Sequence, residues 1–316
     1  MNPHSQLTLL TFSENATFMA QDPVTGRRLI LRVHRPGYST PEEINAELAW
    51  LEAIKAQGSI NVAAPVAMTH GGKIAELREG GTSTWVVAFE FVSGREPDKT
   101  MDLRHWYRLL GETAGHLHLH SQSWPRPVGF ARKTWRYETI IGQHAFWGDW
   151  RALDQFSAEE ISLLTQVEAD IRNRLEVYGT SADRFGLVHC DMRLANLLVD
   201  GDKLTVIDFD DCGICWFGWD FATAVSFIED DAHLNEYLSA WLTGYRTARH
   251  FSADDEAMLP VLIMLRRLQL TAWIASHAET PTAQQLIQDW GKNTADLARK
   301  YLHDPLIISS KETQDA

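Results

Sequence analysis

Three polar residues in the second half of the chain, Asp191, Asn196 and Asp208, have the types and spacing that phosphoryl transfer requires. Asp191 can orient a hydroxyl group and accept its proton. Asn196 offers an amide oxygen and Asp208 a carboxylate, and hard oxygen ligands that leave room for water and phosphate suit Mg²⁺. The pattern therefore predicts metal-assisted transfer of a phosphoryl group to a hydroxyl. The surrounding segments are His189-Cys190-Asp191-Met192-Arg193-Leu194-Ala195-Asn196 and Ile207-Asp208-Phe209-Asp210.

The elements around these residues must bring Asn196 and Asp208 together. Residues 187–200 and 204–209 are predicted to form strand, loop and strand. The Asp-Gly-Asp sequence at 200–202 is a turn signal that folds the two strands onto each other. We therefore expect Asn196 and Asp208 at the same end of a hairpin.

The first 92 residues are rich in short strand-like segments, and one helix interrupts them. Thr40 can cap a helix that begins at Pro41, because Glu43 stands three residues after the cap as in a capping box. Residues 92–97 are predicted to form a linker. The predicted strands cover residues 7–12, 17–21, 28–34, 66–70, 73–79 and 84–91.

Beyond the linker the apolar pattern becomes helical, and the strand-loop-strand segment that carries Asp191 interrupts it. This order of elements predicts an α+β fold with two lobes, a β-rich N-terminal lobe and a mainly helical C-terminal lobe. The predicted helices cover residues 103–120, 157–178, 216–228, 232–247, 253–277 and 282–302.

Composition excludes several classes of protein. The chain has 316 residues and a net charge of −13, so it lacks the cationic field of a nucleic-acid-binding protein. Cys212 and Cys215 form a C-x-x-C pair without nearby zinc ligands, and three cysteines in all favour a reducing compartment. The apolar run 261–265 ends at Arg266 and Arg267, far short of the ~20 residues of a membrane span. With no secretory signal visible, we expect a cytoplasmic protein that does not contact a membrane.

The HxDxxxxN pattern at 189–196 and the IDFD sequence at 207–210 resemble the catalytic and metal-binding motifs of the aminoglycoside phosphotransferase and choline kinase-like family. That family shares its fold with protein kinases. The resemblance implies a nucleotide-binding lobe at residues 1–92 and a catalytic and substrate-binding lobe at 93–316. It implies an enzyme, an ATP- and Mg²⁺-dependent kinase that phosphorylates a hydroxyl of a small-molecule acceptor.

The resemblance assigns roles in the C-terminal lobe residue by residue. Asp191 matches the catalytic base, and Asn196 and Asp208 match the metal ligands. Arg193 stands where protein kinases carry a lysine near the transferred phosphate, and a guanidinium there can pair with the γ-phosphate. Asp220 matches an aspartate that braces the catalytic loop.

The resemblance also assigns nucleotide-binding roles in the N-terminal lobe. Arg32 stands where the family's third strand carries a lysine to the α- and β-phosphates, and arginine differs from lysine in size and geometry. Glu47, on the following helix, matches the acidic partner of that cation. The backbone of Glu90 and Val92 matches the hinge that holds a purine.

One departure from protein kinases concerns the loop that covers the phosphates. The chain has no G-x-G-x-x-G sequence, and the corresponding turn at residues 13–18 contains no glycine. Ser13, Asn15 and Thr17 are the candidates for contacting the nucleotide. An ordinary turn is the alternative interpretation.

Two other functions remain open. A Ser/Thr protein kinase of the same superfamily would need a peptide-docking segment, and only 12 residues separate Asp208 from Asp220. A nucleotide-binding scaffold without turnover is favoured by Arg32 and the glycine-free loop, whereas Asp191 and Asn196 argue against it. ATP consumption against a panel of hydroxyl metabolites distinguishes the three.

Acidic residues are concentrated in residues 200–260, which contain 13 acidic and 3 basic side chains. A solvated face is one interpretation, and a cleft that attracts a cationic or metal-bound ligand is the other. Glu229, Asp230 and Asp231 are the acids to examine. We expect an acceptor that carries a positive charge or an amine, while its identity and the oligomeric state stay open.

Overall fold

The computed structural model describes residues 4–12 and 15–303. The chain divides into two compact units by its internal contacts, and two segments from far along the sequence belong to the N-terminal one. The predicted division of roles at residues 92 and 93 stays a prediction. The first unit consists of Met1–Glu96, Trp124–Lys133 and Asn196–Asp210, and the second of Pro97–Ser123, Thr134–Ala195 and Asp211–Ala316.

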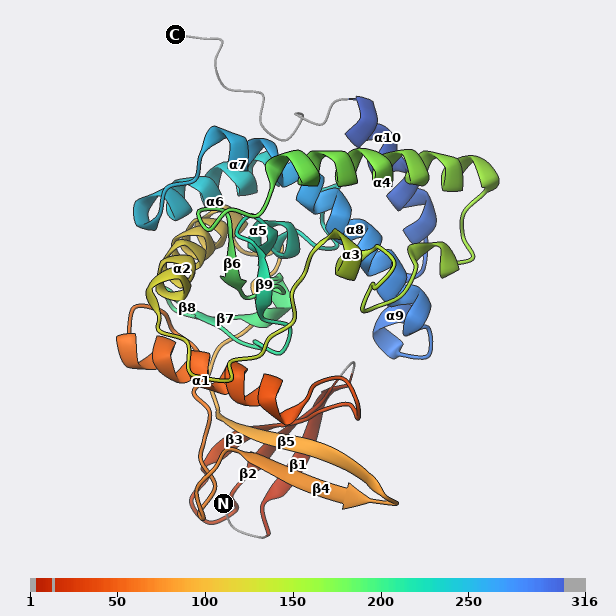
Figure 1. Cartoon of the computed structure of the whole chain (residues 1–316). Helices are drawn as coiled ribbons and strands as arrows, with labels where there is room; N and C mark the ends of the chain where they lie inside the picture. The colour runs from red at the N-terminus through yellow and green to blue at the C-terminus, as the bar shows by residue number, and fades with distance from the viewer. Residues whose placement is uncertain (1–3, 13–14, 304–316) are drawn as a thin grey trace. The chain divides into compact units, whose positions relative to one another are not determined.

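The first unit is built on a five-stranded antiparallel sheet with the order β1-β2-β3-β5-β4 (Figure 1). Arg32 lies on the central strand, in register with Thr17 and Val87 on the two neighbouring strands. Five of the six predicted strands are confirmed, but 66–70 is not a strand, although isolated bridges at Val62 and Pro65 precede it. The strands are β1 (Gln6–Phe12), β2 (Ala16–Gln21), β3 (Arg28–Val33), β4 (Ile74–Glu79) and β5 (Thr82–Glu90).

Helix α1 (Pro41–Gln57) packs on this sheet (Figure 1). The predicted capping box is confirmed, because the Thr40 side chain accepts from the Glu43 N–H and the Glu43 carboxylate accepts from the Thr40 N–H. The helix ends at Gly58, whose φ of 78° is the left-handed conformation that glycine adopts without strain. The buried side of α1 carries Glu47 among apolar residues, including Trp50.

A hairpin of β7 (Leu197–Asp200) and β8 (Lys203–Val206) completes the first unit. Backbone hydrogen bonds join it to Asn61 and to Arg95, which lie in the N-terminal segment. Trp50 of α1 contacts Phe209 edge to face, with 5.5 Å between ring centroids. These contacts attach the predicted metal-binding segment to the N-terminal sheet and its helix.

The second unit is mainly helical, so the α+β class is confirmed. The larger helices are α2 (Leu103–Ser123), α4 (Ala158–Tyr178), α6 (Leu234–Ala248), α8 (Leu259–Ser276) and α10 (Trp290–His303), and the shorter ones are α3 (Tyr137–Ile140), α5 (Trp219–Ala224), α7 (Ala253–Ala257) and α9 (Pro281–Leu286). Helices α2 and α6 cross very closely and have glycines where they meet. A Cβ added at Gly244 would lie 1.8 Å from the carbonyl oxygen of Arg108, and one added at Gly111 would lie 2.0 Å from the carbonyl oxygen of Trp241.

Two of the predicted helices are shorter than expected. The prediction of 216–228 is wrong at both ends, because β9 (Gly213–Trp216) pairs with β6 (Phe185–Val188) and α5 covers only Trp219–Ala224. The prediction of 282–302 is wrong in its continuity, because a break separates α9 from α10 and Asp289 adopts a φ of 58° there. The spacing of apolar residues does not reveal such breaks, because the apolar pattern continues where the backbone stops being helical.

Within the described residues, Ala253–Ser276 is the one helical stretch long and apolar enough to cross a membrane. In the structure, 94% of its apolar window is buried inside the protein. It therefore forms the core of the second unit, where its apolar surface packs against α5, α10 and the short helix η1 (Trp150–Ala152).

Candidate active site

After β6 the chain turns sharply through His189 and Cys190 to Asp191. Cys190 has a φ of 69°, in the left-handed region that residues other than glycine seldom adopt. The Oδ1 of Asp220 on α5 accepts a hydrogen bond from the Cys190 N–H (2.8 Å), and its Oδ2 accepts one from the His189 N–H (3.2 Å). Charge-assisted bonds of this kind hold a strained turn in place. The prediction that Asp220 braces this loop is confirmed.

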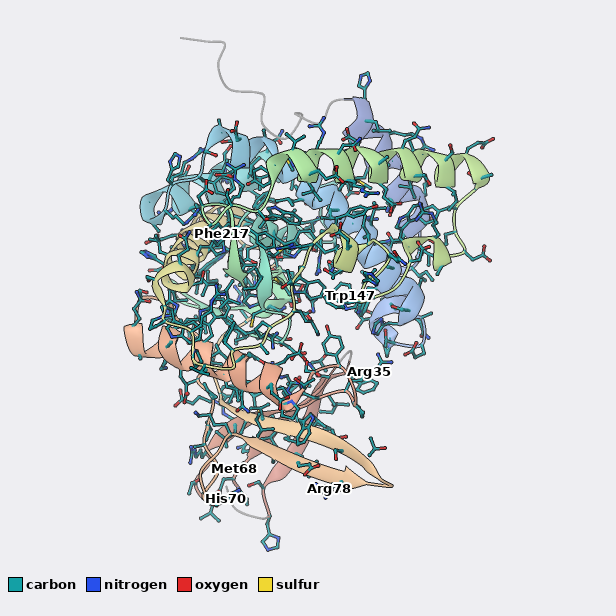
Figure 2. The ribbon with its side chains drawn as sticks, viewed as in Figure 1. Arg35, Met68, His70, Arg78, Trp147 and Phe217 are labelled. Atoms are coloured by element: carbon teal, nitrogen blue, oxygen red, sulfur yellow. The ribbon has the colours of Figure 1, made fainter. Side chains whose placement is uncertain are left out.

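His118 of α2 fixes Asp220 in turn. Its Nε2 lies 3.0 Å from the Asp220 carboxylate and its Nδ1 lies 2.8 Å from the hydroxyl of Tyr245. The ring also packs against Phe217, at 4.7 Å between centroids (Figure 2). Burial lowers the pKa of His118 more than Asp220 raises it, so the ring is neutral. We therefore assign the proton to Nε2, which donates to Asp220, while Nδ1 accepts from Tyr245.

Asp191 is mostly buried, with 15% of its side chain exposed. Its Oδ1 accepts from an Nη of Arg266 at 2.6 Å, and its Oδ2 accepts from the Nε of Arg193 at 3.1 Å. Burial raises the pKa of Asp191, but the charges of Arg193 and Arg266 lower it by a larger amount. The net pKa of Asp191 is therefore below its ordinary value. An ionised carboxylate is thus present at neutral pH.

Sequence reasoning missed Arg266 as a partner of Asp191. The available signal was the Arg266-Arg267 pair inside an otherwise apolar helix, because buried guanidinium groups are nearly always paired with acids. The structure pairs Arg267 with Glu229 at 3.1 Å, and both side chains are buried. The pattern could therefore have predicted two ion pairs, but not which acids form them.

The predicted metal ligands both belong to the first unit. Asn196 is buried and ends the short helix η2 (Leu194–Asn196), and its carbonyl accepts from the Ile207 N–H at 3.0 Å. This bond continues the β7–β8 hairpin and puts Asn196 and Asp208 at the same end, as predicted. Asp208 has a φ of 61°, and 46% of its side chain is exposed.

The donor set at this end of the hairpin fits a hard divalent cation. One amide oxygen and one carboxylate leave most coordination positions to phosphate oxygens and water, which is how Mg²⁺ is usually held beside a nucleotide. Among the described residues, no three His, Cys, Asp or Glu side chains cluster as a metal site. The role of Asn196 and Asp208 as metal ligands stays a prediction.

Arg32 occupies the centre of a buried charge cluster in the first unit. An Nη donates to Glu47 at 2.6 Å, as expected for its predicted partner, and the other Nη donates to Asp208 at 3.3 Å. Asp210 lies 3.8 Å away. Burial by itself lowers the pKa of Arg32, but these three carboxylates together raise it above the ordinary value. The structure thus links the predicted phosphate-binding cation directly to a predicted metal ligand.

His34 and Asp210 belong to the same cluster and were not predicted. His34 Nε2 accepts from the Arg32 Nε at 3.4 Å, so its Nδ1 carries the proton and faces Asp210 at 3.6 Å. Burial and the charge of Arg32 lower the pKa of His34 to about 3. Burial raises the pKa of Asp210, but Arg32 and His34 outweigh it and bring it to about 2. At neutral pH, Arg32 and Asp210 are therefore charged and His34 is neutral.

The three candidates in the polar turn have different surroundings. Ser13 lies outside the described residues. Thr17 lies within β2. Asn15 donates from Nδ2 to Asp210 at 2.7 Å and accepts from the Arg35 N–H at 3.3 Å, so its side chain ties the turn to the charge cluster. Its role in nucleotide binding stays a prediction.

The predicted purine-binding backbone lies at the end of β5. The Glu90 N–H donates to the carbonyl of Ala64 at 2.9 Å, and the Glu90 carboxylate reaches Lys55 at 3.7 Å. Val92 follows directly after the strand. The predicted nucleotide contacts and the predicted metal ligands thus lie in the first unit, whereas Asp191 and Arg193 lie in the second. The residues in the first unit are Arg32, Glu47, Glu90, Val92, Asn15, Asn196 and Asp208.

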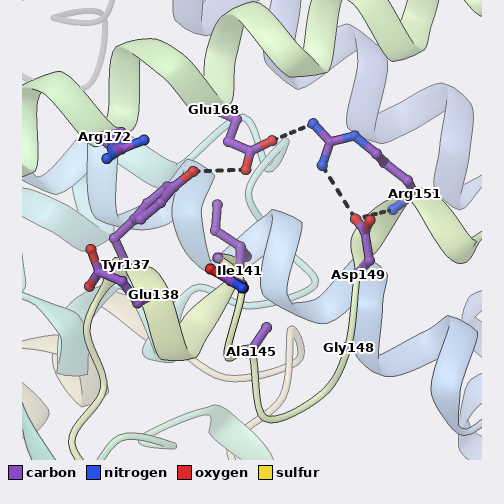
Figure 3. Close-up of a pocket in the computed structure, with 11 residues that line it drawn as sticks. Tyr137, Glu138, Ile141, Ala145, Gly148, Asp149, Arg151, Glu168 and Arg172 are labelled. Atoms are coloured by element: carbon purple, nitrogen blue, oxygen red, sulfur yellow. Dashed lines mark hydrogen bonds and ion pairs between the residues drawn. The ribbon is translucent and has the colours of Figure 1, made fainter.

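A separate pocket of about 500 Å³ lies in the second unit (Figure 3). Glu168 accepts from the Tyr137 hydroxyl at 2.9 Å and from Arg151 at 2.6 Å, and Arg151 also contacts Asp149. None of the predicted site residues lines this pocket. Figure 3 shows the bonds that join Tyr137, Glu168, Arg151 and Asp149 to one another.

Comparison with known proteins gives the same assignment as these motifs. The sequence profile of the phosphotransferase enzyme family (APH) matches residues 11–251. A solved structure of a microcompartment-associated aminopropanol kinase is 41% identical, with a TM-score of 0.88, over 95% of this chain and 93% of that one.

Two similarities to amicoumacin kinases are more distant. A solved structure of one, in complex with AMP-PNP, Ca²⁺ and Ami, is 20% identical with a TM-score of 0.74, over 94% of this chain and 89% of that one. The amicoumacin kinase of Bacillus subtilis (strain 168) is 23% identical over 250 residues, which cover 76% of this chain and 71% of that one. The kinase-like fold predicted from the motifs is confirmed.

Proposed function

This chain belongs to the phosphotransferase enzyme family and is a kinase that phosphorylates a hydroxyl group of a small molecule, and on that premise we propose that its acceptor is a small amino alcohol. The observation that carries the proposal is the 41% identity over 95% of the chain to an aminopropanol kinase. Such an acceptor has an amine that is protonated at neutral pH, in agreement with the positively charged acceptor expected from residues 200–260.

The proposed donor is ATP, with Mg²⁺ held by Asn196 and Asp208. The ion, when bound, would neutralise charge on the transferred phosphoryl group. Asp191 orients the acceptor hydroxyl and takes its proton as the oxygen attacks. Arg193, next to Asp191, pairs with the γ-phosphate in this proposal. The protein's own contribution is thus to position the two reactants and to stabilise charge.

The proposed nucleotide contacts lie in the N-terminal lobe. Arg32, held by Glu47, contacts the α- and β-phosphates. The backbone of Glu90 and Val92 binds the purine, and Asn15 lies in the turn above the phosphates. The pairing of Arg32 with Glu47 supports this proposal, because the acidic partner holds the guanidinium in a fixed position and so reduces the entropy lost when it binds a phosphate. A cytoplasmic location, where ATP is abundant, is part of the same proposal.

The electrostatic support for a cationic acceptor is weaker in the structure than in the sequence. Glu229 is buried and paired with Arg267, and Asp231 is paired with Lys99. Cations from outside the acidic stretch therefore neutralise part of it. Asp230 is exposed and is the member of the predicted acidic trio best placed to act on a ligand through solvent.

The test is a pair of acceptors that share a carbon skeleton and differ in one group, a charged amine in the first and a neutral hydroxyl in the second. We expect ATP-dependent phosphorylation of 1-amino-2-propanol with a kcat/KM at least tenfold above that of 1,2-propanediol, in which a hydroxyl replaces the amine. Ethanolamine, choline and homoserine extend the panel. An equal kcat/KM for the amino alcohol and the diol, or a higher value for the diol, would contradict the amino-alcohol proposal. Neither result would affect the assignment as a kinase.

A further inference from the structure

Arg266 is a buried arginine that makes an ion pair with the proposed catalytic base, Asp191. Only 4% of its side chain is exposed. One Nη donates to Asp191 at 2.6 Å, the other Nη donates to Gln269 at 2.9 Å, and its Nε donates to Ser226 at 3.3 Å. The guanidinium also lies 5.4 Å from the ring of Trp147, in the segment between α3 and η1 (Figure 2).

These contacts leave the guanidinium little freedom. Each of its three nitrogens has a hydrogen-bond acceptor, and the acceptors come from different segments of the second unit. A buried guanidinium requires a negative partner, and Asp191 is the carboxylate in ion-pair contact with Arg266 in the described chain. The neighbouring Arg267 on the same helix pairs instead with Glu229, so the two arginines have separate roles.

We propose that Arg266 is a positioning residue for phosphoryl transfer, which fixes the rotamer of Asp191 and keeps its carboxylate ionised. The inference rests on the proposed function of Asp191 as the base. Arg266 holds Oδ1, and a carboxylate has about four lone-pair sites, so the Oδ1–Arg266 and Oδ2–Arg193 contacts leave acceptor sites for a substrate hydroxyl. The orientation of those remaining sites is set by the two arginines.

The geometry makes a specific prediction about pH. Among the described residues, the charged or titratable groups that act most strongly on Asp191 are Arg193 and His189 from its own loop and Arg266 from α8. Without the positive charge of Arg266, less remains to counter the effect of burial, which raises the pKa of Asp191. The pKa of Asp191 should therefore rise when Arg266 is lost. The acidic limb of the kcat/KM profile should then move to higher pH, because more of the base is protonated at a given pH.

The experiment compares Arg266→Gln, Arg266→Lys and Arg267→Gln. We expect Arg266→Gln to lower kcat 10- to 100-fold, to move the acidic limb up by at least half a pH unit and to change KM for ATP less than threefold. Arg266→Lys keeps the positive charge but cannot make all three contacts, so its acidic limb should stay within 0.2 units of wild type while kcat falls a few-fold. The matched control Arg267→Gln removes a buried ion pair of the same helix and should lower Tm without moving the acidic limb.

Several results would overturn the proposal. One is an Arg266→Gln variant with an unshifted acidic limb and kcat within twofold of wild type. Another is an equal shift in Arg267→Gln, which would mean that general loosening of α8 is the cause. If Arg266→Gln does not fold, Arg266→Lys decides alone, and wild-type kcat in that variant refutes a positioning role. Failure of the base assignment itself is seen separately, as retained activity in Asp191→Asn.

Discussion

At the scale of single residues, Asp191 and Arg32 each lie at the centre of a small charge cluster, and the two clusters belong to different units. Each cluster is mostly buried, so its charges interact more strongly than they would in water. Substitution of a central residue therefore changes both the chemistry and the balance of charge around it. The predictions for these residues must separate the two effects.

Asp191→Ala should lower kcat by about 10²- to 10⁴-fold, because general-base assistance and acceptor orientation occur in the transition state. ATP binding by calorimetry should be nearly unchanged. Asp230→Ala, which removes an exposed acid from the same unit, is the control and should retain kcat. An Asp191→Ala variant with more than about a tenth of wild-type kcat would contradict the assignment.

Arg32→Lys should bind ATP as well as wild type or better, because the family resemblance implies a lysine at this position. Arg32→Ala should bind ATP more weakly and should also lose about 3–5 kcal/mol of stability, since Glu47 is then buried without a partner. Calorimetric ATP titration at a temperature where both variants are folded measures the first effect. Equal affinity of wild type and Arg32→Ala would refute a phosphate contact.

His34 makes the stability of the first unit depend on pH. Its pKa is lowered from 6.5 to about 3 in the folded protein, so the unfolded chain binds a proton more readily. The contribution to the free energy of unfolding is complete above pH 6.5 and is lost as the pH falls toward 3. Urea unfolding at pH 7, 5 and 4 should show this loss in wild type and a smaller loss in His34→Asn. The exposed His70→Asn should behave as wild type, and identical slopes in all three proteins would refute the assignment to His34.

At the scale of elements, local sequence signals placed most helices and strands, and close packing decided how they meet. The α2–α6 crossing depends on glycines at the contact, where the backbones approach too closely for a side chain. His118 extends from α2 to Asp220, which holds the turn at His189 and Cys190. The geometry of that turn therefore depends on how α2 is positioned by its crossing with α6.

Gly244→Ala should destabilise the second unit by about 1–3 kcal/mol, because the added Cβ would lie 1.8 Å from a carbonyl oxygen of α2 and must push the helices apart. Thermal unfolding measures this effect. Ser239→Ala, an exposed change on the same helix, is the control and should shift Tm little. An unchanged Tm in Gly244→Ala would mean that the crossing adjusts without cost.

At the scale of the whole molecule, the net charge of −13 is the property most relevant to a charged substrate. A negative protein attracts a cation over distances comparable to the Debye length, which is about 10 Å at 0.1 M salt. Ion pairs with Lys99 and Arg267 reduce the field from residues 200–260 but leave the total unchanged.

The kcat/KM for a cationic amino alcohol should therefore fall as salt rises from about 0.02 to 0.3 M, while that for a neutral diol should change little. Both acceptors are measured with ATP held at saturation, so that salt effects on nucleotide binding do not enter. A parallel decline for both acceptors would show that salt acts on the enzyme rather than on attraction of the cation.

The sequence by itself determined the chemistry, the order of elements and the class of fold. Asp191, Asn196 and Asp208 could be proposed as site residues because phosphoryl transfer needs those residue types at that spacing. The capping box at Thr40 and most strands followed from local patterns, since capping and side-chain alternation depend on near neighbours.

Only the tertiary structure decided which buried charges are partners. Arg266 lies 75 residues from Asp191, and Arg32 lies 178 residues from Asp210, so no local pattern relates them. The same limit applies to the breaks at Trp216 and between α9 and α10, where apolar periodicity continues while the backbone changes direction. Partner choice depends on how apolar faces pack, because burial creates the need for an opposite charge and packing determines which charge lies within reach.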